Sequence, residues 1–136
     1  MPAIGQISLT DGQATPVTHV FNPINSNPPI YKRNGVGAAL IAEETLNVDL
    51  KRATANSPVN RPVLVLEIPV LEQSTGATPS GYTAPPKVAY VERVKIEFFH
   101  HQRSVESSRK DLRVMAAKLL LDPAIVALIE KLEKPY

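Results

Sequence analysis

The side chains that could do chemistry in this sequence are few and poorly arranged for catalysis. Its 136 residues include no cysteine, which excludes a disulfide framework, a cysteine-ligated zinc site and a thiol nucleophile. His100 and His101 lie close to Glu97, but adjacent strand residues point to opposite faces, so both imidazoles cannot ligate one ion. His19 is the one other histidine. We therefore expect no metal site.

Two pairs of carboxylates, Glu43-Glu44 and Glu130/Glu133, have the residue type needed for general acid–base chemistry. No glycine-rich phosphate loop, nucleophile elbow or histidine-based triad accompanies them. Glu130 and Glu133 also flank lysines, which is typical of a solvated helix face. The sequence therefore predicts neither an enzyme nor a bound cofactor.

Polar residues alternate with apolar ones along two further segments. Two sets each share one parity: Asn47, Asp49 and Lys51, and Arg93, Lys95 and Glu97. Taken alone, this pattern is typical of the solvated face of a half-exposed sheet. The alternative is a surface whose cations contact phosphates, although a net charge of +2 does not by itself indicate a nucleic-acid partner.

Strands are needed to position these polar sets. Three runs have one apolar and one largely polar parity: 45–51, 61–71 and 88–99. They predict an antiparallel sheet that is covered on one face. Residues 1–22 are expected to form a hairpin around Asp11-Gly12, because Asp-Gly is a strong hairpin signal.

Two proline-rich segments are expected to lie outside the strands. Residues 22–29 (NPINSNPP) are expected to form a loop, and residues 30–33 a short strand that ends at Asn34-Gly35. Residues 74–86 have neither a strand nor a helix period and contain three prolines, so we expect a projecting, semi-rigid arm.

After His101 the apolar period changes from 2 to 3.6, which predicts helices. A capping box at 108–111 is expected to begin the first, and Asp122-Pro123 the second. Their apolar stripes contain Leu112, Met115, Leu119, Ile125, Leu128, Ile129 and Leu132.

The predicted fold class is α+β in a single domain, 1–136, with strands first and two helices last. It divides into a hairpin (1–22), a sheet (30–101) with its arm (74–86), and two helices (104–134). A hydrophobic content of 43% and a charged content of 21% exclude a disordered chain. No transmembrane segment or signal peptide is expected, so we expect a soluble, unprocessed protein made in the cytoplasm.

Covering the apolar face poses a packing problem. Two short helices with narrow apolar stripes must cover a sheet of five or six strands. Helices from a second copy would complete the cover, so we expect a homodimer, the commonest oligomer of soluble chains.

The sequence resembles the coat proteins of single-stranded RNA bacteriophages, the levivirus-like group, over essentially its whole length. Four segments carry the resemblance: ISLTDGQATPVTHVFNP as the opening hairpin, RPVLVLEIPVLEQ with its Glu67-Ile68-Pro69 step as the central strand, the 74–86 arm, and LLLDPAIVALIEKLEKPY as the second helix and C-terminus.

The resemblance implies an N-terminal hairpin, a five-stranded antiparallel sheet and two helices that clasp the partner in an intertwined homodimer with a continuous sheet. Such dimers assemble into a quasi-equivalent (T=3) icosahedral shell around single-stranded genomic RNA. The inner sheet face can bind an RNA hairpin and repress translation of the replicase.

The resemblance also implies an RNA-binding set on the inner face: Asn47, Asp49, Lys51, Val63, Val65, Arg93, Lys95 and Glu97. Val65 replaces a lysine of the best-known members, and Arg93 replaces a base-stacking tyrosine, although an arginine can also stack on a base. The apolar helix stripes are the expected dimer interface. The alternative to a shell protein is a small dimeric RNA-binding regulator.

Overall fold

The computed structural model describes residues 3–33, 40–72, 79–82 and 84–136. The chain divides into two compact units. The first comprises Met1–Arg52 and Arg61–Phe99, and the second comprises Ala53–Asn60 and His100–Tyr136. The first unit therefore holds most of the strands, and the second holds both α-helices.

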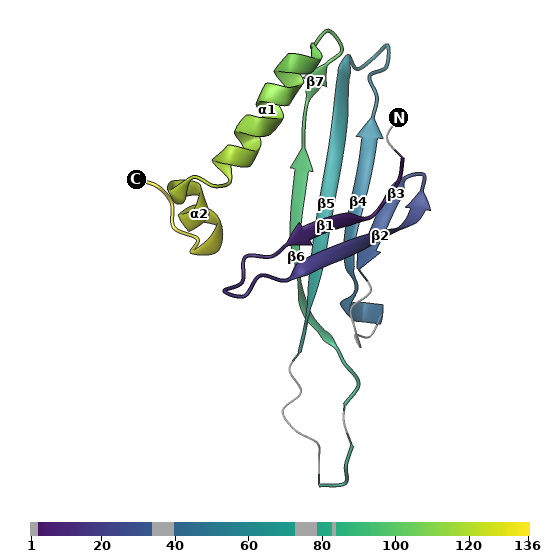
Figure 1. Cartoon of the computed structure of the whole chain (residues 1–136), viewed down its shortest axis with the longest axis vertical. Coiled ribbons are helices and arrows are strands. Elements are labelled where there is room, and N and C mark those ends of the chain that lie inside the picture. Colours follow the sequence, from purple (N-terminus) through teal and green to yellow (C-terminus); the bar gives the residue numbers. More distant parts are fainter. Residues whose placement is uncertain (1–2, 34–39, 73–78, 83) are drawn as a thin grey trace. The chain divides into compact units, whose positions relative to one another are not determined.

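The first unit is built on antiparallel strands that follow one another in spatial order (Figure 1). Their bounds are β1 (Ile7–Thr10), β2 (Thr18–Ser26), β3 (Pro29–Arg33), β4 (Glu44–Lys51), β5 (Val59–Leu71) and β6 (Val88–Glu97), with a 3-10 turn, η1 (Leu40–Ala42), before β4. The alternating runs of the sequence thus became β4, β5 and β6. The α+β prediction is confirmed, with one strand more in this path than the expected five.

The prediction of a loop at 22–29 is wrong, because β2 continues to Ser26 and pairs with β3. The strand accommodates its one proline, Pro23, through a register shift between Pro23 and Asn25, as expected where a proline cannot donate to a ladder. The connection after β1 also differs from a tight Asp-Gly turn. Asp11 Oδ1 accepts hydrogen bonds from the backbone N–H of Gln13 and Val17, which stabilise a longer loop.

The hairpin of β1 and β2 lies across the apolar face of the sheet (Figure 1). Phe21 of β2 is 1% exposed and packs with Tyr31 and Leu46 into a core that Ile7 and Leu66 extend. We expected the helices alone to cover this face. The hairpin does part of that work, because the pairing of Ile7 with Phe21 places both on the same hairpin face.

The second unit contains β7 (His100–His101), which pairs with Val59 and Asn60 of β5, and two helices, α1 (Glu106–Leu119) and α2 (Pro123–Glu130). Asp122 caps α2 as predicted, since its carboxylate accepts from the N–H of Ala124. The predicted capping box is wrong, because α1 begins two residues before Ser108 with Val105 as its N-cap. Arg109 instead donates to the carbonyl and hydroxyl oxygens of Ser104, which precedes the helix.

Two predicted segments fall partly or wholly outside the described residues. Asn34-Gly35 and positions 74–78 and 83 of the predicted arm are among them. The described arm positions 79–82 and 84–86 are exposed and belong to no strand or helix.

Replacing Phe21 with alanine should remove the contact that fastens the hairpin to the sheet. We expect the free energy of unfolding to fall by about 3–5 kcal/mol, the range for truncating a buried phenylalanine. Urea unfolding followed by circular dichroism measures this. Val17→Ala, at a 47% exposed site in the same hairpin, should change it by less than about 0.5 kcal/mol. Equal losses would contradict the assigned core.

Candidate nucleic-acid interface

The register of β4, β5 and β6 sorts their side chains onto two faces. Leu46, Leu66 and Val94 lie opposite one another across the three strands, as do Val48, Leu64 and Ile96. The intervening positions carry the polar residues. Because side chains alternate along each strand, one face is apolar and the other is polar.

The polar face collects every residue of the expected RNA-binding set. Two rows cross the three strands on this face: Asn47–Val65–Lys95 and Asp49–Val63–Glu97. Lys51 and Arg93 lie further along β4 and β6 on the same face, opposite Arg61 and Glu67 of β5. The strand register thus brings together on one face the residues that the family resemblance implied.

Carboxylates pair with two of the cations on this face. Arg93 Nε lies 3.2 Å from Glu67 Oε1 across the strand pair, and Lys95 Nζ lies 3.1 Å from Glu97 Oε2 on the same strand. The side chains of Arg93 and Lys95 are 60% and 54% exposed. Exposed pairs of this kind contribute little to stability, so both cations can exchange their partner for a phosphate at small cost.

Arg61 was missed in the sequence, although it shares the parity of Val63 and Val65. It lies directly opposite Lys51 across β4 and β5. Within the described residues, neither cation forms an ion pair with a carboxylate. Like charges that face each other across strands repel, so this end of the polar face favours an anion.

Val63 lies on the same face but is only 9% exposed, so its neighbours cover most of its side chain. Its neighbour Val65 is half-buried. The contacts that this face offers a ligand therefore come mainly from its exposed polar side chains, whose cations suit phosphates.

The apolar face has an open groove of about 330 Å³ beside the hairpin. Only aliphatic side chains line it: Ile7, Leu9, Leu46, Val48, Leu64, Leu66, Val94 and Ile96. Within the second unit, neither helix has a buried residue. The predicted interface residues are half-buried at Ile125 and Leu128, and exposed at Leu112, Met115, Leu119, Ile129 and Leu132.

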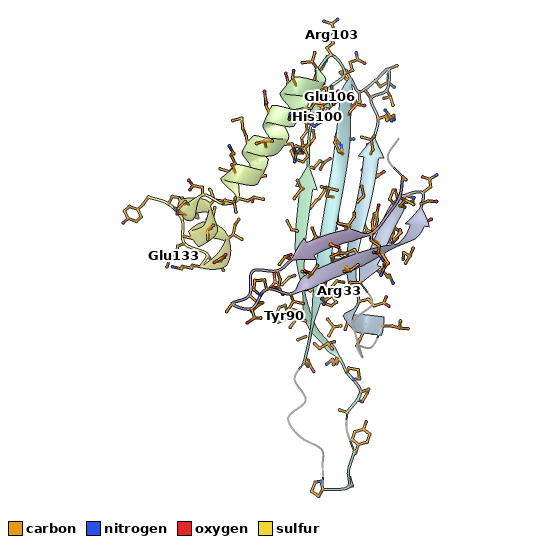
Figure 2. The ribbon with its side chains drawn as sticks, viewed as in Figure 1. Arg33, Tyr90, His100, Arg103, Glu106 and Glu133 are labelled. Atoms are coloured by element: carbon orange, nitrogen blue, oxygen red, sulfur yellow. The ribbon has the colours of Figure 1, made fainter. Side chains whose placement is uncertain are left out.

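The long strand β6 is paired along one edge, with β5, within the described part of the chain. It exposes two large side chains: Tyr90, labelled in Figure 2, at 56%, and Val91 at 51%. In the described ranges, no three histidine, aspartate or glutamate side chains are arranged to hold a metal ion. None of the helices there is long and apolar enough to span a bilayer.

Comparison with solved structures gives the class of protein. The virus-like particle of bacteriophage ESE058 contains a chain with a TM-score of 0.87 and 31% identity, and the match covers 99% of this chain and 100% of that one. The virus-like particle of bacteriophage NT-214 (TM-score 0.83, 21% identity, 99% and 100% covered) and the protein capsid of bacteriophage GA (0.69, 13%, 96% and 95%) share the fold.

The chain belongs to the levivirus coat protein family, which matches residues 2–136. It is thus a structural protein of the phage virion, and the resemblance drawn from the sequence is confirmed. No curated protein matches the chain.

Replacing Lys51 with glutamine should remove its repulsion with Arg61. At low ionic strength and without RNA, we expect the free energy of unfolding to rise by a few tenths of a kcal/mol. The gain should vanish in high salt, where surface charges are screened. Thermal unfolding at both salt concentrations measures it. Lys95→Gln breaks the pair with Glu97 and should give no gain, so equal effects would contradict the repulsion.

Proposed function

We propose that the chain forms homodimers that assemble into an icosahedral shell around single-stranded RNA, and that the polar sheet face binds that RNA. The full-length similarity to a chain of the ESE058 virus-like particle supports the shell. The Lys51–Arg61 pair within a face that also exposes Arg93 and Lys95 supports RNA binding. Synthesis would take place in the cytoplasm of the host.

Dimerisation is proposed because each unit leaves apolar surface that a second copy can bury. The first unit has its aliphatic groove and the β6 edge, and the second has the apolar stripes of α1 and α2. We propose that α2 of one copy packs into the groove of the other. Pairing of the two β6 edges would then make the sheets continuous and satisfy their exposed backbone groups.

RNA binding on this face divides the polar residues by task. Lys51, Arg61 and Lys95 would contact phosphates, which position RNA without reading its sequence. Asn47 has an amide that can read a base edge, and Arg93 has a guanidinium that can stack on a base. If they recognise a hairpin in the replicase message, the dimer would also repress its translation.

Ile129→Asp tests the proposed helix interface. Ile129 is 56% exposed in the single chain, so a carboxylate there costs the isolated fold little. In a dimer it would be an unpaired buried charge, which costs several kcal/mol. We expect sedimentation to show loss of the dimer and electron microscopy to show loss of closed shells. Glu130→Gln on the same helix should leave both intact. Unchanged assembly by Ile129→Asp would contradict the interface.

Binding of an RNA hairpin set at several salt concentrations tests the polar face. Lys51→Ala and Arg61→Ala should weaken all RNAs alike and each lower the salt slope by about one. Asn47→Ala or Arg93→Ala should cost about 1–3 kcal/mol for a preferred hairpin and less for others.

Lys110→Ala, at an exposed lysine of α1, is the matched control and should bind RNA normally. Unchanged affinity in a Lys51/Arg93/Lys95 triple alanine variant would show that the polar face is only a solvated surface. If electron microscopy of the unmodified protein shows free dimers and no closed shells, the result would instead favour an RNA-binding regulator.

A further inference from the structure

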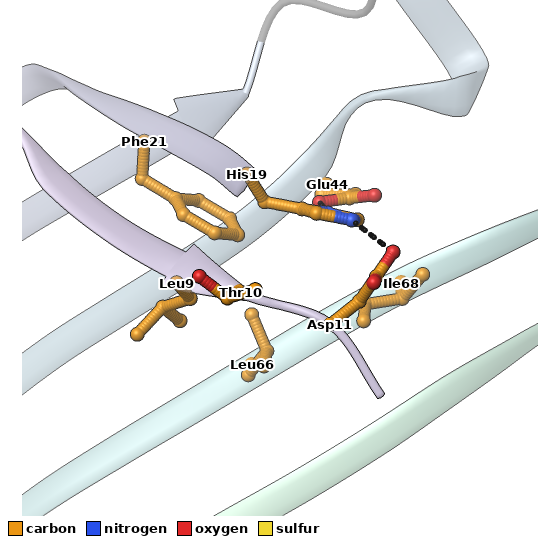
Figure 3. A pocket seen from close by; sticks show the side chains of 8 residues that line it. All are labelled: Leu9, Thr10, Asp11, His19, Phe21, Glu44, Leu66 and Ile68. Carbon is orange, nitrogen blue, oxygen red and sulfur yellow. Dashed lines mark hydrogen bonds and ion pairs between the residues drawn. The ribbon is translucent and has the colours of Figure 1, made fainter. Parts of the chain in front are cut away.

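A cluster of four charged groups lies where the hairpin meets the apolar face of the sheet. Figure 3 shows three of them, Asp11, His19 and Glu44. His19 comes from β2 and Asp11 from the loop after β1, whereas Arg33 ends β3 and Glu44 begins β4. The Glu44 residue is only 9% exposed. The coat function proposed above does not use this cluster.

Both nitrogens of the His19 ring face carboxylates. Nδ1 lies 2.7 Å from Glu44 Oε2, and Nε2 lies 3.1 Å from Asp11 Oδ2. A neutral imidazole has a single N–H, so only the imidazolium can donate to both carboxylates at once. The Asp11 contact stays within the hairpin, but the Glu44 contact joins the hairpin to the sheet.

Arg33 offers an alternative partner to the same ring nitrogen. Its Nη1 lies 2.7 Å from His19 Nδ1 and 2.9 Å from Glu44 Oε1. A neutral ring could accept this N–H at Nδ1 while donating from Nε2 to Asp11. Glu44 Oε2 would then face a lone pair and lose its donor.

We propose that His19 is a proton-controlled latch that docks the N-terminal hairpin onto the sheet when the ring is charged and loosens it when the ring is neutral. With an imidazolium, the two carboxylates and two cations sum to zero. With a neutral ring the sum is −1 beside a half-buried apolar pocket, where an uncompensated charge is costly.

The surroundings of His19 contain few other charges. β1 and β5 contribute Leu9, Thr10, Leu66 and Ile68 to this pocket, and none of them is charged. Glu92 of β6 lies opposite Ile68 on the same face and is exposed. The response to pH thus depends mainly on His19 and its three charged neighbours.

The direction of the pH response follows from these contacts. The hydrogen bond to Glu44 raises the pKa of His19 above its ordinary 6.5, against the opposing effect of burial. A raised pKa contributes stability that is fully present below 6.5 and is lost as pH rises through the higher value. Hydrogen bonds, first that from the Val17 N–H, lower the pKa of Asp11 below 3.8. Its contribution is therefore present above pH 3.8 and is lost only as pH falls below that value.

Hydrogen exchange of the full-length assembly between about pH 5 and pH 9 tests the latch, because that range brackets histidine titration. Rates are corrected for intrinsic exchange, and β5 amides serve as the internal reference. Protection of β1 and β2 amides should fall by up to about tenfold per pH unit as pH rises above 6.5, and should level off above the raised pKa of the docked His19 ring. The β5 amides should not follow.

Three variants make this result specific. In His19→Gln the hairpin should lose the pH dependence, whereas His101→Gln should keep it. Glu44→Gln retains the histidine and Asp11 but removes the carboxylate at Nδ1, so the transition should move to lower pH. It also keeps the test valid if His19→Gln fails to fold. The proposal would be overturned if protection of the β1 and β2 amides did not change with pH in the unmodified chain. It would also be overturned if that protection fell together with the protection of β5. The same transition in His19→Gln would overturn it as well.

Discussion

The apolar face of the sheet needs a cover, and the rest of the structure depends on how that need is met. Phe21 of the hairpin lies against this face and packs with Tyr31 and Leu46. These three residues form a small core for a chain of 136 residues. Beside them an aliphatic groove stays open, and neither helix of the second unit has a buried side chain. The apolar surface that these contacts leave open is what the proposed second copy would bury.

The same strand alternation links this cover to the chemistry of the opposite face. Every apolar residue that β4, β5 and β6 turn toward the hairpin places its neighbours on the polar face. Lys51, Arg61 and Lys95 are therefore fixed on a surface whose backbone is held by the strand ladder. A register slip of one residue would exchange the two faces, so packing of the core and presentation of the cations depend on one register.

The sequence was most informative where a periodic pattern extended over several residues. The parity of Leu46 and Val48 against Asn47 and Asp49 was enough to assign both faces of β4. Asp122-Pro123 located the start of α2, because the capping side chain acts on a backbone N–H two residues away. Such local signals need no knowledge of the remaining fold.

Long-range contacts were beyond the reach of these patterns. The continuation of β2 through Pro23 depends on pairing with β3 and overrides the loop preference of its residues. The start of α1 was predicted two residues too late, because no side chain caps this helix and the capping signal at Ser108 is therefore not used. His19 shares the parity of Phe21, and that parity could have drawn attention to it. Its partner Glu44 is 25 positions away, however, and only the folded hairpin brings them together.

Disulfide trapping between two different chains tests the central claim, that a second copy covers the apolar face. The chain has no cysteine, so single cysteines can be placed as Ile129→Cys in α2 of one chain and Leu64→Cys in the groove of another. When the two variants are mixed and oxidised, a disulfide should join one Ile129→Cys chain to one Leu64→Cys chain. Lys51→Cys, on the polar face, should not cross-link with Ile129→Cys. If the double variant Leu64→Cys/Ile129→Cys closes its disulfide within one chain and the mixed chains stay separate, the helix covers its own sheet and the account is contradicted.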